Sequence, residues 1–415
     1  MTPTRRTALA LAALALAAPF VATWLILLVA VAIVSACVAD ALLVRETPAL
    51  RREAPSVVVR GRPARMSLEL AEPARGRARL RQPVGPDLKL LPAESDAALD
   101  AELLGRRRGR HPLPAAAVRL YGPLGLGAWT HSIGDAAEVR VYPDLPGARR
   151  LAASVRRGRF REEGRRTRGP IGLGTDFETL REYSPDDDVR QVNWLATARL
   201  GRPISNQFRV ERDRDVICLV DCGRLTAAPV GDATRLDIAI DAAVAVAAVA
   251  EEAGDRCGTI AFDAQLRRSV APRRAGTGHV VQALFDLEPV AVDSDYERAF
   301  HELTRAKRAF ALVLTDLIEP TAAQPLVDAL PVLARHHAVA VASIVDPDLT
   351  ALARDEPHAP LDVYRAAVAL DVLAARKTAR AHLRRAGAQV IEARPELLPA
   401  ACVRAYLHAK ARARL

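Results

Sequence analysis

The sequence predicts a multi-domain chain that begins with a transmembrane helix or helical hairpin, continues as a β-sandwich and ends in a doubly wound α/β sheet. Three patterns support this prediction. Residues 8–39 carry no charge, residues 55–145 contain short alternating segments, and residues 214–415 alternate apolar strands with helices. A length of 415 residues fits two or three domains. Aromatic residues make up only 4%, so we expect cores built from Ala, Val and Leu.

The uncharged run is 32 residues long, or about 48 Å of helix, whereas one membrane span needs about 20 residues. We expect Pro19 to kink or break this helix. Two arrangements remain: one span with excess length, or a tight hairpin of two short arms. Arg5 and Arg6 before the run and Arg45 after it favour a hairpin with both ends cytoplasmic. A cleaved signal peptide is the alternative, but the run is too long and lacks a clear small-x-small site.

Residues 55–145 are predicted to form a β-sandwich, because short strand-like segments are separated by Pro and Gly. The predicted strands are 56–59, 66–70, 78–81, 117–121 and 138–142. Residues 146–171 contain nine arginines and are predicted to be a solvated linker, or a patch that docks on anionic lipid or an acidic partner. The predicted parts are a membrane anchor (1–45), a β-sandwich (55–145), a linker with a polar signature run (146–213) and an α/β domain (214–415).

The net charge of +10 raises the question of a nucleic-acid partner. No basic patch interleaved with aromatics and no nucleic-acid motif is present, so we expect a lipid membrane and no nucleic acid as partner. The five cysteines are odd in number and lack zinc-ligand spacing, which indicates reduced, buried thiols in a cytosolic domain. They are Cys37, Cys218, Cys222, Cys257 and Cys402.

The α/β domain is predicted from apolar strands at 216–220, 258–262, 310–315, 338–345 and 389–391. Helices are predicted at 236–253, 278–287, 295–308 and 361–386, and near the C-terminus. Buried strands that alternate with helices imply a parallel, doubly wound sheet. The chain has no Gly-x-x-x-x-Gly-Lys phosphate loop, so it is not an ATPase by itself.

Asp221, Asp316 and Asp346 stand at the ends of three predicted strands. Ligands of open α/β sheets bind beyond the carboxyl ends of the strands, and carboxylates there can hold a hard divalent cation. Alternatively, each aspartate caps a helix or closes a turn, which Pro347 favours for Asp346. Asp221 and Asp316 are therefore candidate metal ligands.

Asp221 opens the run Asp-Cys-Gly-Arg-Leu, and residues 215–394 resemble a von Willebrand factor A-type domain, whose metal site begins with Asp-x-Ser-x-Ser. The resemblance implies a cation site at Asp221 and Asp316, with Thr277 offered as the family's threonine. Gly223 and Leu225 replace the two serines. We therefore expect a degenerate site, at which Mg²⁺ is the one candidate cofactor and strong binding is not expected.

A polar run at residues 172–221 precedes the first strand of this domain. On it the chain resembles the family called domain of unknown function 58, with Asp186 where that family usually has Gly. Residues 123–126, Tyr406 and Lys410 also fit, so the resemblance covers nearly the whole chain, membrane segment included. The matching residues are Gly172, Gly174, Phe177, Leu180, Arg181, Tyr183, Asp187, Asp188, Arg190, Trp194, Ala198 and Arg199.

The aspartates at 186–188 are expected to cap a helix that begins near Val189, with Val192, Leu195 and Ala196 facing inward. Such a run would form a brace between two domains or a recognition surface for a partner. Acid–base chemistry by Asp187 and Asp188 is a third interpretation, but no His, Ser or Lys of the signature run pairs with them.

The resemblance implies a partnership with a MoxR-type AAA+ ATPase. We expect a non-enzymatic adaptor that works with such an ATPase in the assembly or maturation of envelope proteins. It would lie in the inner (cytoplasmic) membrane with its soluble domains in the cytoplasm. The alternative is a metal-dependent hydrolase of cell-envelope metabolism that uses Asp221 and Asp316.

Overall fold

The computed structural model describes residues 1–415 except 18, 20, 73–75, 158–175, 185–191, 210–212, 305–307, 317–319, 355, 357 and 412–415. Of residues 176–179, 181, 206–209 and 320–323 it describes the backbone alone. The chain divides into two units, Met1–Tyr142 and Pro143–Leu415.

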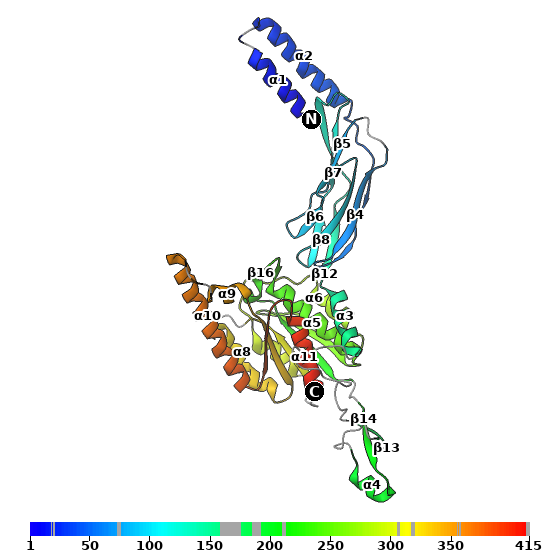
Figure 1. The fold of residues 1–415 in the computed structure, drawn as a ribbon, viewed down its shortest axis with the longest axis vertical. Helices are drawn as coiled ribbons and strands as arrows, with labels where there is room; N and C mark the ends of the chain where they lie inside the picture. The colour runs from blue at the N-terminus through cyan, green and yellow to red at the C-terminus, as the bar shows by residue number, and fades with distance from the viewer. Residues whose placement is uncertain are drawn as a thin grey trace. The chain divides into compact units, whose positions relative to one another are not determined.

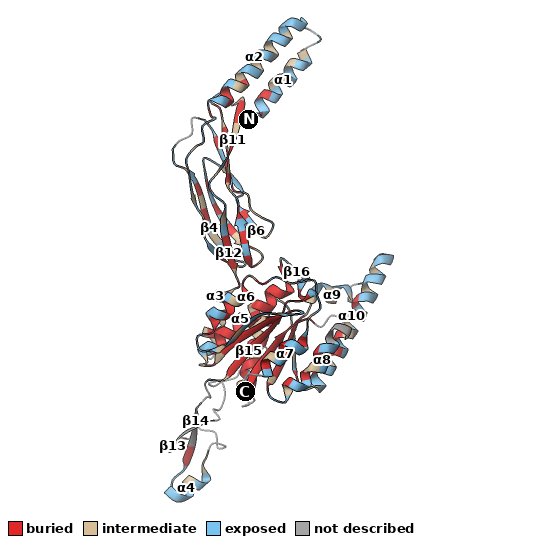
Figure 2. Cartoon of the chain, turned by 180° about the vertical axis from the view of Figure 1, so that it is seen from behind, coloured by how far each residue is buried: buried red, intermediate tan, exposed pale blue. Residues whose placement is uncertain are grey.

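The first unit begins with two apolar helices that lie side by side, α1 (Arg5–Ala17) and α2 (Thr23–Leu42) (Figure 1). The helix break predicted at Pro19 is therefore confirmed. With 20 residues and a mean hydropathy of 2.7, α2 is long and apolar enough to cross a membrane. Most of its surface is exposed (Figure 2), as expected of a helix that lipid would cover. The 13 residues of α1 reach only about 20 Å.

The rest of the first unit is rich in sheet, as predicted, and its sheets share one core. Side chains of Leu68, Leu80, Leu103 and Val118 meet there, and all are fully buried. A five-stranded sheet has the order β1 (Thr2–Pro3), β11 (Gly127–Ile133), β10 (Ala116–Tyr121), β5 (Ala78–Arg81), β7 (Glu94–Asp96). A four-stranded sheet has the order β2 (Leu50–Glu53), β4 (Pro63–Leu70), β8 (Ala98–Gly105), β6 (Leu88–Leu91). A three-stranded sheet has the order β3 (Val57–Val59), β12 (Ala137–Tyr142), β9 (Gly109–Leu113).

The second unit is built on a six-stranded sheet whose middle strands are parallel. Its order is β19 (Leu266–Arg273), β18 (Arg256–Phe262), β15 (Asp215–Asp221), β20 (Ala309–Leu314), β21 (Ala338–Ile344), β22 (Gln389–Ala393). The prediction of a fully parallel sheet is wrong at one edge, because β19 runs antiparallel to β18. The three arginines and the proline of β19 explain why the sequence did not predict this strand, although charged residues and proline are typical of an edge strand.

Helices cover both faces of this sheet (Figure 1). On one face, Ile217 and Leu219 of β15 share a core with α7 (Tyr296–Thr304), α8 (Pro320–Ala334) and α10 (Pro360–Arg385). On the other, α5 (Arg235–Glu252) packs on β15 and is itself flanked by α6 (Thr277–Leu284) and α11 (Leu398–Ala411). Two prolines inside α8 explain why the sequence did not predict that helix. The short elements are β16 (Pro229–Val230), β17 (Ala233–Thr234) and α9 (Pro347–Leu352).

Part of the predicted linker at 146–171 is a helix instead. α3 spans Leu145–Arg156 and packs on α5. Asp144 caps it by accepting a hydrogen bond from the backbone N–H of Gly147 at 3.0 Å, and the N–H of Asp144 donates to Asp241 of α5 at 3.1 Å. The first arginines of this segment therefore lie on a folded helix of the α/β unit rather than on a linker.

The signature run forms a hairpin of β13 (Asp176–Glu182) and β14 (Ile204–Arg209), with α4 (Trp194–Leu200) between the two strands. The helix expected to begin near Val189 begins at Trp194, where the side chain of Asn193 accepts from the N–H of Ala196 at 2.9 Å. Val192 forms a β-bridge with Ser205 instead of joining the helix. Leu195, expected to face inward, is exposed.

Candidate functional site

Two carboxylates lie at the carboxyl ends of the two strands between which the strand order of the sheet reverses. Asp221 is the last residue of β15, and Asp316 follows β20 by two positions. From β15 the chain winds outward to β18 and β19, then returns to β20 on the other side of β15 and winds outward again. Clefts of open α/β sheets form at the carboxyl ends of the two strands that flank such a reversal.

Asp221 is buried, and its two carboxylate oxygens accept four hydrogen bonds. Oδ1 accepts from the N–H of Gly223 at 2.8 Å and from the hydroxyl of Ser294. Oδ2 accepts from the hydroxyls of Thr315 at 2.6 Å and Tyr296 at 2.9 Å. Hydrogen bonds to a charged group are the stronger ones, so this set stabilises a buried anion without a metal.

Tyr296 is the most buried hydroxyl group around Asp221. It begins α7, and its ring packs edge-on against Phe262 with ring centroids 5.5 Å apart. Burial and the nearby negative charge of Asp221 raise the pKa of Tyr296 well above its usual value. The phenol therefore stays protonated and acts as a hydrogen-bond donor to Asp221.

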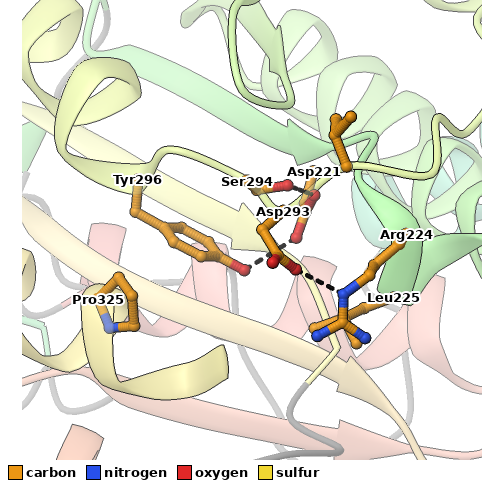
Figure 3. A pocket seen from close by; sticks show the side chains of 8 residues that line it. Asp221, Arg224, Leu225, Asp293, Ser294, Tyr296 and Pro325 are labelled. Carbon is orange, nitrogen blue, oxygen red and sulfur yellow. Dashed lines mark hydrogen bonds and ion pairs between the residues drawn. The ribbon is translucent and has the colours of Figure 1, made fainter. Parts of the chain in front are cut away.

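A pocket of about 210 Å³ opens beside Asp221 (Figure 3). Leu225, Val292 and Pro325 supply apolar surface to it. At its rim, the side chain of Arg224 is directed at Asp293, with Nε 2.5 Å from Oδ1. Within the pocket, Asp221 is the buried acidic group and the Arg224–Asp293 pair is the exposed one.

Asp316 lies in a buried ion-pair network. Arg235, the first residue of α5, donates to its Oδ2, and Arg376 of α10 donates to its Oδ1 at 3.0 Å. The hydroxyl of Ser343 also donates to Oδ1, at 3.1 Å. Both arginine side chains are only 5% exposed. Two guanidinium groups thus surround this carboxylate.

Asp346 completes the network. Its Oδ1 accepts from the backbone N–H of Asp348 at 3.0 Å, which confirms the predicted role as a cap, here of α9. Its Oδ2 also accepts from Arg235 at 2.9 Å. Two carboxylates and two guanidinium groups therefore balance each other in charge, and Arg235 joins the ends of two neighbouring strands.

This arrangement does not fit a divalent cation as it stands. Asp221 and Asp316 already accept donors at both oxygens, and guanidinium groups surround Asp316. Among the described residues, no group of three His, Cys, Asp or Glu side chains is placed to hold a metal ion. Cation binding at Asp221 and Asp316 would require displacement of these donors, so it stays a prediction.

The hydroxyl partners of Asp221 are not those that the sequence offered. Thr277 starts α6, where its N–H donates to Glu251 at 3.1 Å, whereas Thr315, Ser294 and Tyr296 bond Asp221. A signal for Thr315 was present, since it directly precedes Asp316. Gly223, which replaces the first serine, has a packing reason: a Cβ there would overlap Ser294 Oγ and lie 2.8 Å from the carbonyl oxygen of Val292.

The structure describes only part of the signature run. Gly172, Gly174, Asp187, Asp188 and Arg190 lie outside the described residues, so the expected cap at residues 186–188 is not described either. Phe177 and Arg181 lie on β13, but their side chains are not described. Leu180, Trp194 and Arg199 are exposed, and Tyr183 is half-buried. The structure thus does not bring the described signature residues into the site around Asp221.

A second buried network lies at the opposite, amino ends of the strands, where Asp255 directly precedes β18. Asp255 accepts from the hydroxyl of Tyr406 at 2.5 Å and from Lys410 Nζ at 2.7 Å, and Lys410 also donates to the carbonyl of Ala253 at 3.2 Å. Burial and the charge of Asp255 raise the pKa of Tyr406 well above its usual value. The network fastens α11 to the sheet.

The chain matches the family described as "Protein of unknown function DUF58" over residues 179–392. The matched region runs from β13 of the signature hairpin to β22 of the sheet and includes Asp221, Asp316 and Asp346. The chain belongs to this family. The predicted family is therefore confirmed over residues 179–392, whereas Gly172, Gly174 and Phe177, residues 123–126 and the C-terminal Tyr406 and Lys410 lie outside the matched region.

Relatives with curated records are uncharacterized proteins of Mycobacterium bovis and Mycobacterium tuberculosis. Each is 29% identical over 185 residues, which cover 42% of this chain and 56% of the relative. The chain thus spans little more than half the length of these relatives. A solved structure of a mutant SrpA adhesin from Streptococcus sanguinis aligns with a TM-score of 0.17 and 10% identity, over 37% of this chain and 78% of that one.

Proposed function

We propose that this DUF58 protein is a membrane-anchored adaptor that works with a MoxR-type AAA+ ATPase in the assembly or maturation of envelope proteins. The observation that carries the proposal is that the carboxylate oxygens of Asp221 and Asp316 are already hydrogen-bonded within the protein. Each accepts hydrogen bonds at both oxygens from groups of the same chain, so neither is poised as a general base or metal ligand. Such a site suits a rigid binding module better than a catalyst.

Two exposed apolar surfaces offer binding sites for a protein partner. On α4, Trp194 and Leu195 are 69% and 68% exposed. On the first half of α10, Leu361, Tyr364 and Val368 recur at helical spacing and are between 57% and 73% exposed. Exposed aromatic and aliphatic groups in clusters mark interaction surfaces, and tryptophan and tyrosine are enriched among the residues that dominate binding energy.

The α/β unit has features of a von Willebrand factor A-type domain, and we include that assignment in the proposal. The sheet order, with an antiparallel edge strand, and the positions of Asp221 and Asp316 after the two central strands support it. In this chain, Arg235 and Arg376 provide the positive charge that a cation provides in metal-binding members. We therefore propose a domain that holds its shape without Mg²⁺.

We place the soluble units in the cytoplasm. All five cysteines are buried thiols, which fits a reducing compartment. Arginines flank the apolar helices at Arg5, Arg6 and Arg45, as expected for segments that stay on the cytoplasmic side. Both observations agree with an anchor in the inner membrane.

Affinity capture tests the adaptor role. The tagged full chain would be recovered from native membranes in mild detergent, and co-purified proteins identified by mass spectrometry. We expect a MoxR-type ATPase among them, and its loss, by tenfold or more, with Trp194→Ala/Leu195→Ala or with Leu361→Ser/Tyr364→Ser. Val332→Ser on α8, also exposed, is the matched control. Recovery of no AAA+ ATPase by the unaltered chain would refute the proposal.

The second candidate, a metal-dependent hydrolase, is kept because of the pocket beside Asp221. It requires a cation to displace the hydroxyl donors of Asp221 or the guanidinium groups of Asp316. Binding to the folded state would raise the melting temperature of the α/β unit by mass action. A rise of several degrees with millimolar Mg²⁺ or Mn²⁺, absent in Asp221→Asn, would favour the hydrolase over the adaptor.

A further inference from the structure

Both ends of the α1–α2 pair are bonded to the same turn of the β domain, residues 122–127, which connects β10 to β11 and includes the first residue of β11. At the first end, β1 pairs with β11, so that Thr2 lies opposite Ala128. The N–H of Thr4 donates to the carbonyl of Leu126 at 3.0 Å, and the hydroxyl of Thr7 donates to the same carbonyl at 2.5 Å. The start of α1 is thus part of the β domain.

At the second end, Asp40 in the last turn of α2 binds the same turn. Its carboxylate accepts backbone N–H groups of Leu124 at 2.9 Å, Leu126 at 2.8 Å and Gly127 at 2.9 Å. Asp40 is only 1% exposed. A carboxylate buried at the end of an apolar helix is costly unless it is fully bonded, and here the turn supplies the bonds.

The turn is shaped to receive α2. A Cβ on Gly127 would lie 2.7 Å from the Cβ of Ala41 and would also overlap the carbonyl oxygen of Cys37. The thiol of Cys37 donates to the carbonyl of Leu126 at 3.3 Å. The backbones of α2 and the turn are therefore in close contact, and this contact fixes the end of α2 on the β domain. We call it the joint.

Basic and aromatic side chains surround this joint. We call them the collar: Arg5, Arg6, Arg45, Arg119, Tyr121 and Trp129. The guanidinium of Arg45 lies over the ring of Trp129 at 6.0 Å, and that of Arg119 over the ring of Tyr121 at 5.3 Å. Trp and Tyr at the end of an apolar helix, together with arginines, are typical of the level of lipid headgroups.

The charges at the start of α1 are not neutralised by a carboxylate of their own turn, although Arg6 donates to the backbone carbonyl of Leu124 at 3.5 Å. Arg5 and Arg6 are exposed and occupy the first turn of a helix, where positive charge is unfavourable beside the helix dipole, and that turn has no acidic residue. Anionic phosphate groups at a membrane surface stabilise arginines in this position. An acidic protein surface would not explain the exposed apolar helices beside them.

We propose that the collar docks on the anionic headgroups of a lipid bilayer and that the joint at residues 122–127 keeps both ends of the α1–α2 pair on one side of it. The pair then enters the membrane as a hairpin, and Thr2 lies on the same side as the soluble units. This topology does not depend on which ATPase the chain binds. Of the two arrangements that the sequence left open, the proposal selects the hairpin.

Thiol labelling tests the topology in the full chain. The five native cysteines are buried and give a low background. Single exposed cysteines at Thr2→Cys and Val332→Cys would be labelled with a membrane-impermeant maleimide in spheroplasts and in inverted membrane vesicles. We expect both positions to react in the same preparation only. Labelling of the two positions from opposite sides would overturn the proposal, and Pro3→Cys repeats the test should Thr2→Cys disturb β1.

Tryptophan quenching tests the collar. The chain has three tryptophans, Trp24 at the start of α2, Trp129 in the collar and Trp194 on α4. Three variants that each keep one of them, with the others replaced by Phe, would be reconstituted in phosphatidylglycerol vesicles that carry a headgroup-level spin label. We expect quenching of Trp129 by the headgroup-level label, reduced at least twofold in Arg45→Gln/Arg119→Gln. Equal quenching of Trp129 with and without the two arginines would overturn the proposal.

Discussion

The guanidinium of Arg235 joins the carboxylates of Asp316 and Asp346, two residues that follow neighbouring strands of the sheet. Arg235 is also the first residue of α5, so the helix that covers one face of the sheet begins at this ion pair. Thr234 and Asp237 form a capping box there, with the N–H of Thr234 donating to Asp237 at 2.8 Å. The start of α5 is therefore held by a cap and by charge.

Removal of Arg235 should destabilise the α/β unit strongly. Arg235→Met leaves Asp316 with Arg376 and Ser343 but takes a buried positive charge from the network. Breaking a buried pair from one side costs about 3 kcal/mol or more. We expect calorimetry of the solubilised chain to show a clear fall in melting temperature. Arg235→Met/Asp316→Asn should recover part of the loss, whereas independent, additive losses would show that the two residues are not coupled.

Introducing a serine at residue 223, where von Willebrand factor A-type metal sites carry one, should destabilise the chain rather than improve the site. The Cβ of Gly223→Ser would overlap Ser294 Oγ and crowd the carbonyl of Val292. Overpacking of this kind costs roughly 1–3 kcal/mol. Gly223→Ser/Ser294→Gly should be more stable than Gly223→Ser alone, because it removes the overlapping hydroxyl. Denaturant unfolding of the two variants measures the difference, and equal stability would contradict the prediction.

His337 should make the α/β unit sensitive to mild acid. Its Nδ1 accepts the N–H of Ala309 at 3.2 Å, which requires an unprotonated nitrogen. Burial, and then the charge of His336, lower the pKa of His337 below its usual value of about 6.5. The folded state therefore binds this proton less readily than the unfolded state, and the free energy of unfolding should fall as the pH drops from about 7 through the lowered pKa.

The variant that checks this is His337→Asn, whose amide oxygen can take the place of Nδ1. Its stability should change less between pH 7 and pH 5 than that of the unaltered chain. His301→Asn, at an exposed position, is the control and should keep the full pH dependence. If His337→Asn lost stability with acid as steeply as the unaltered chain, His337 would not be the titrating group.

Lys410 should contribute as much to the free energy of unfolding as a core residue does, although it is charged. The side chain of Lys410 is only 7% exposed. Lys410→Met leaves the carboxylate of Asp255 buried, with the hydroxyl of Tyr406 as its side-chain donor in the described part of the chain. We expect a loss of about 3 kcal/mol, against no more than about 0.5 kcal/mol for Lys377→Met, an exposed lysine of α10. Urea unfolding compares the two, and similar values would contradict the structural role of the pair.

The sequence predicted the sheet of the α/β unit well because its strands are buried on both faces. The predicted segments 216–220, 258–262 and 338–345 agree with β15, β18 and β21 to within one or two residues. Continuous apolar runs carry this signal regardless of what packs on them. The prediction failed where a strand is buried on one face only. Strand β8 was not predicted, because its Ala, Asp and Glu residues have low strand propensity. Its Leu99, Ala101 and Leu103 nevertheless alternate into the core.

Of the candidate site, the sequence predicted the carboxylates but not their partners. Asp221 and Asp316 end apolar strands, so their position follows from the fold. Ser294 and Tyr296 reach Asp221 from a loop and a helix more than 70 residues away, with sequence separations of 73 and 75. Arg376 reaches Asp316 across a separation of 60 residues. No local pattern encodes such contacts, and they decide whether the carboxylates are free to bind a cation.

The joint between Asp40 and the turn at residues 122–127 also sets an order of events during synthesis. The donors of Asp40 lie 84 to 87 residues later in the chain. At 5–20 residues per second, the ribosome delivers them roughly 4–17 s after Asp40 itself. If α2 enters a membrane as proposed, the carboxylate must stay hydrated through this interval, so the end of α2 would remain at the water boundary while the apolar part is inserted. Folding of the β domain then buries Asp40, so the proposed anchor would reach its final position only after the domain attached to it has folded.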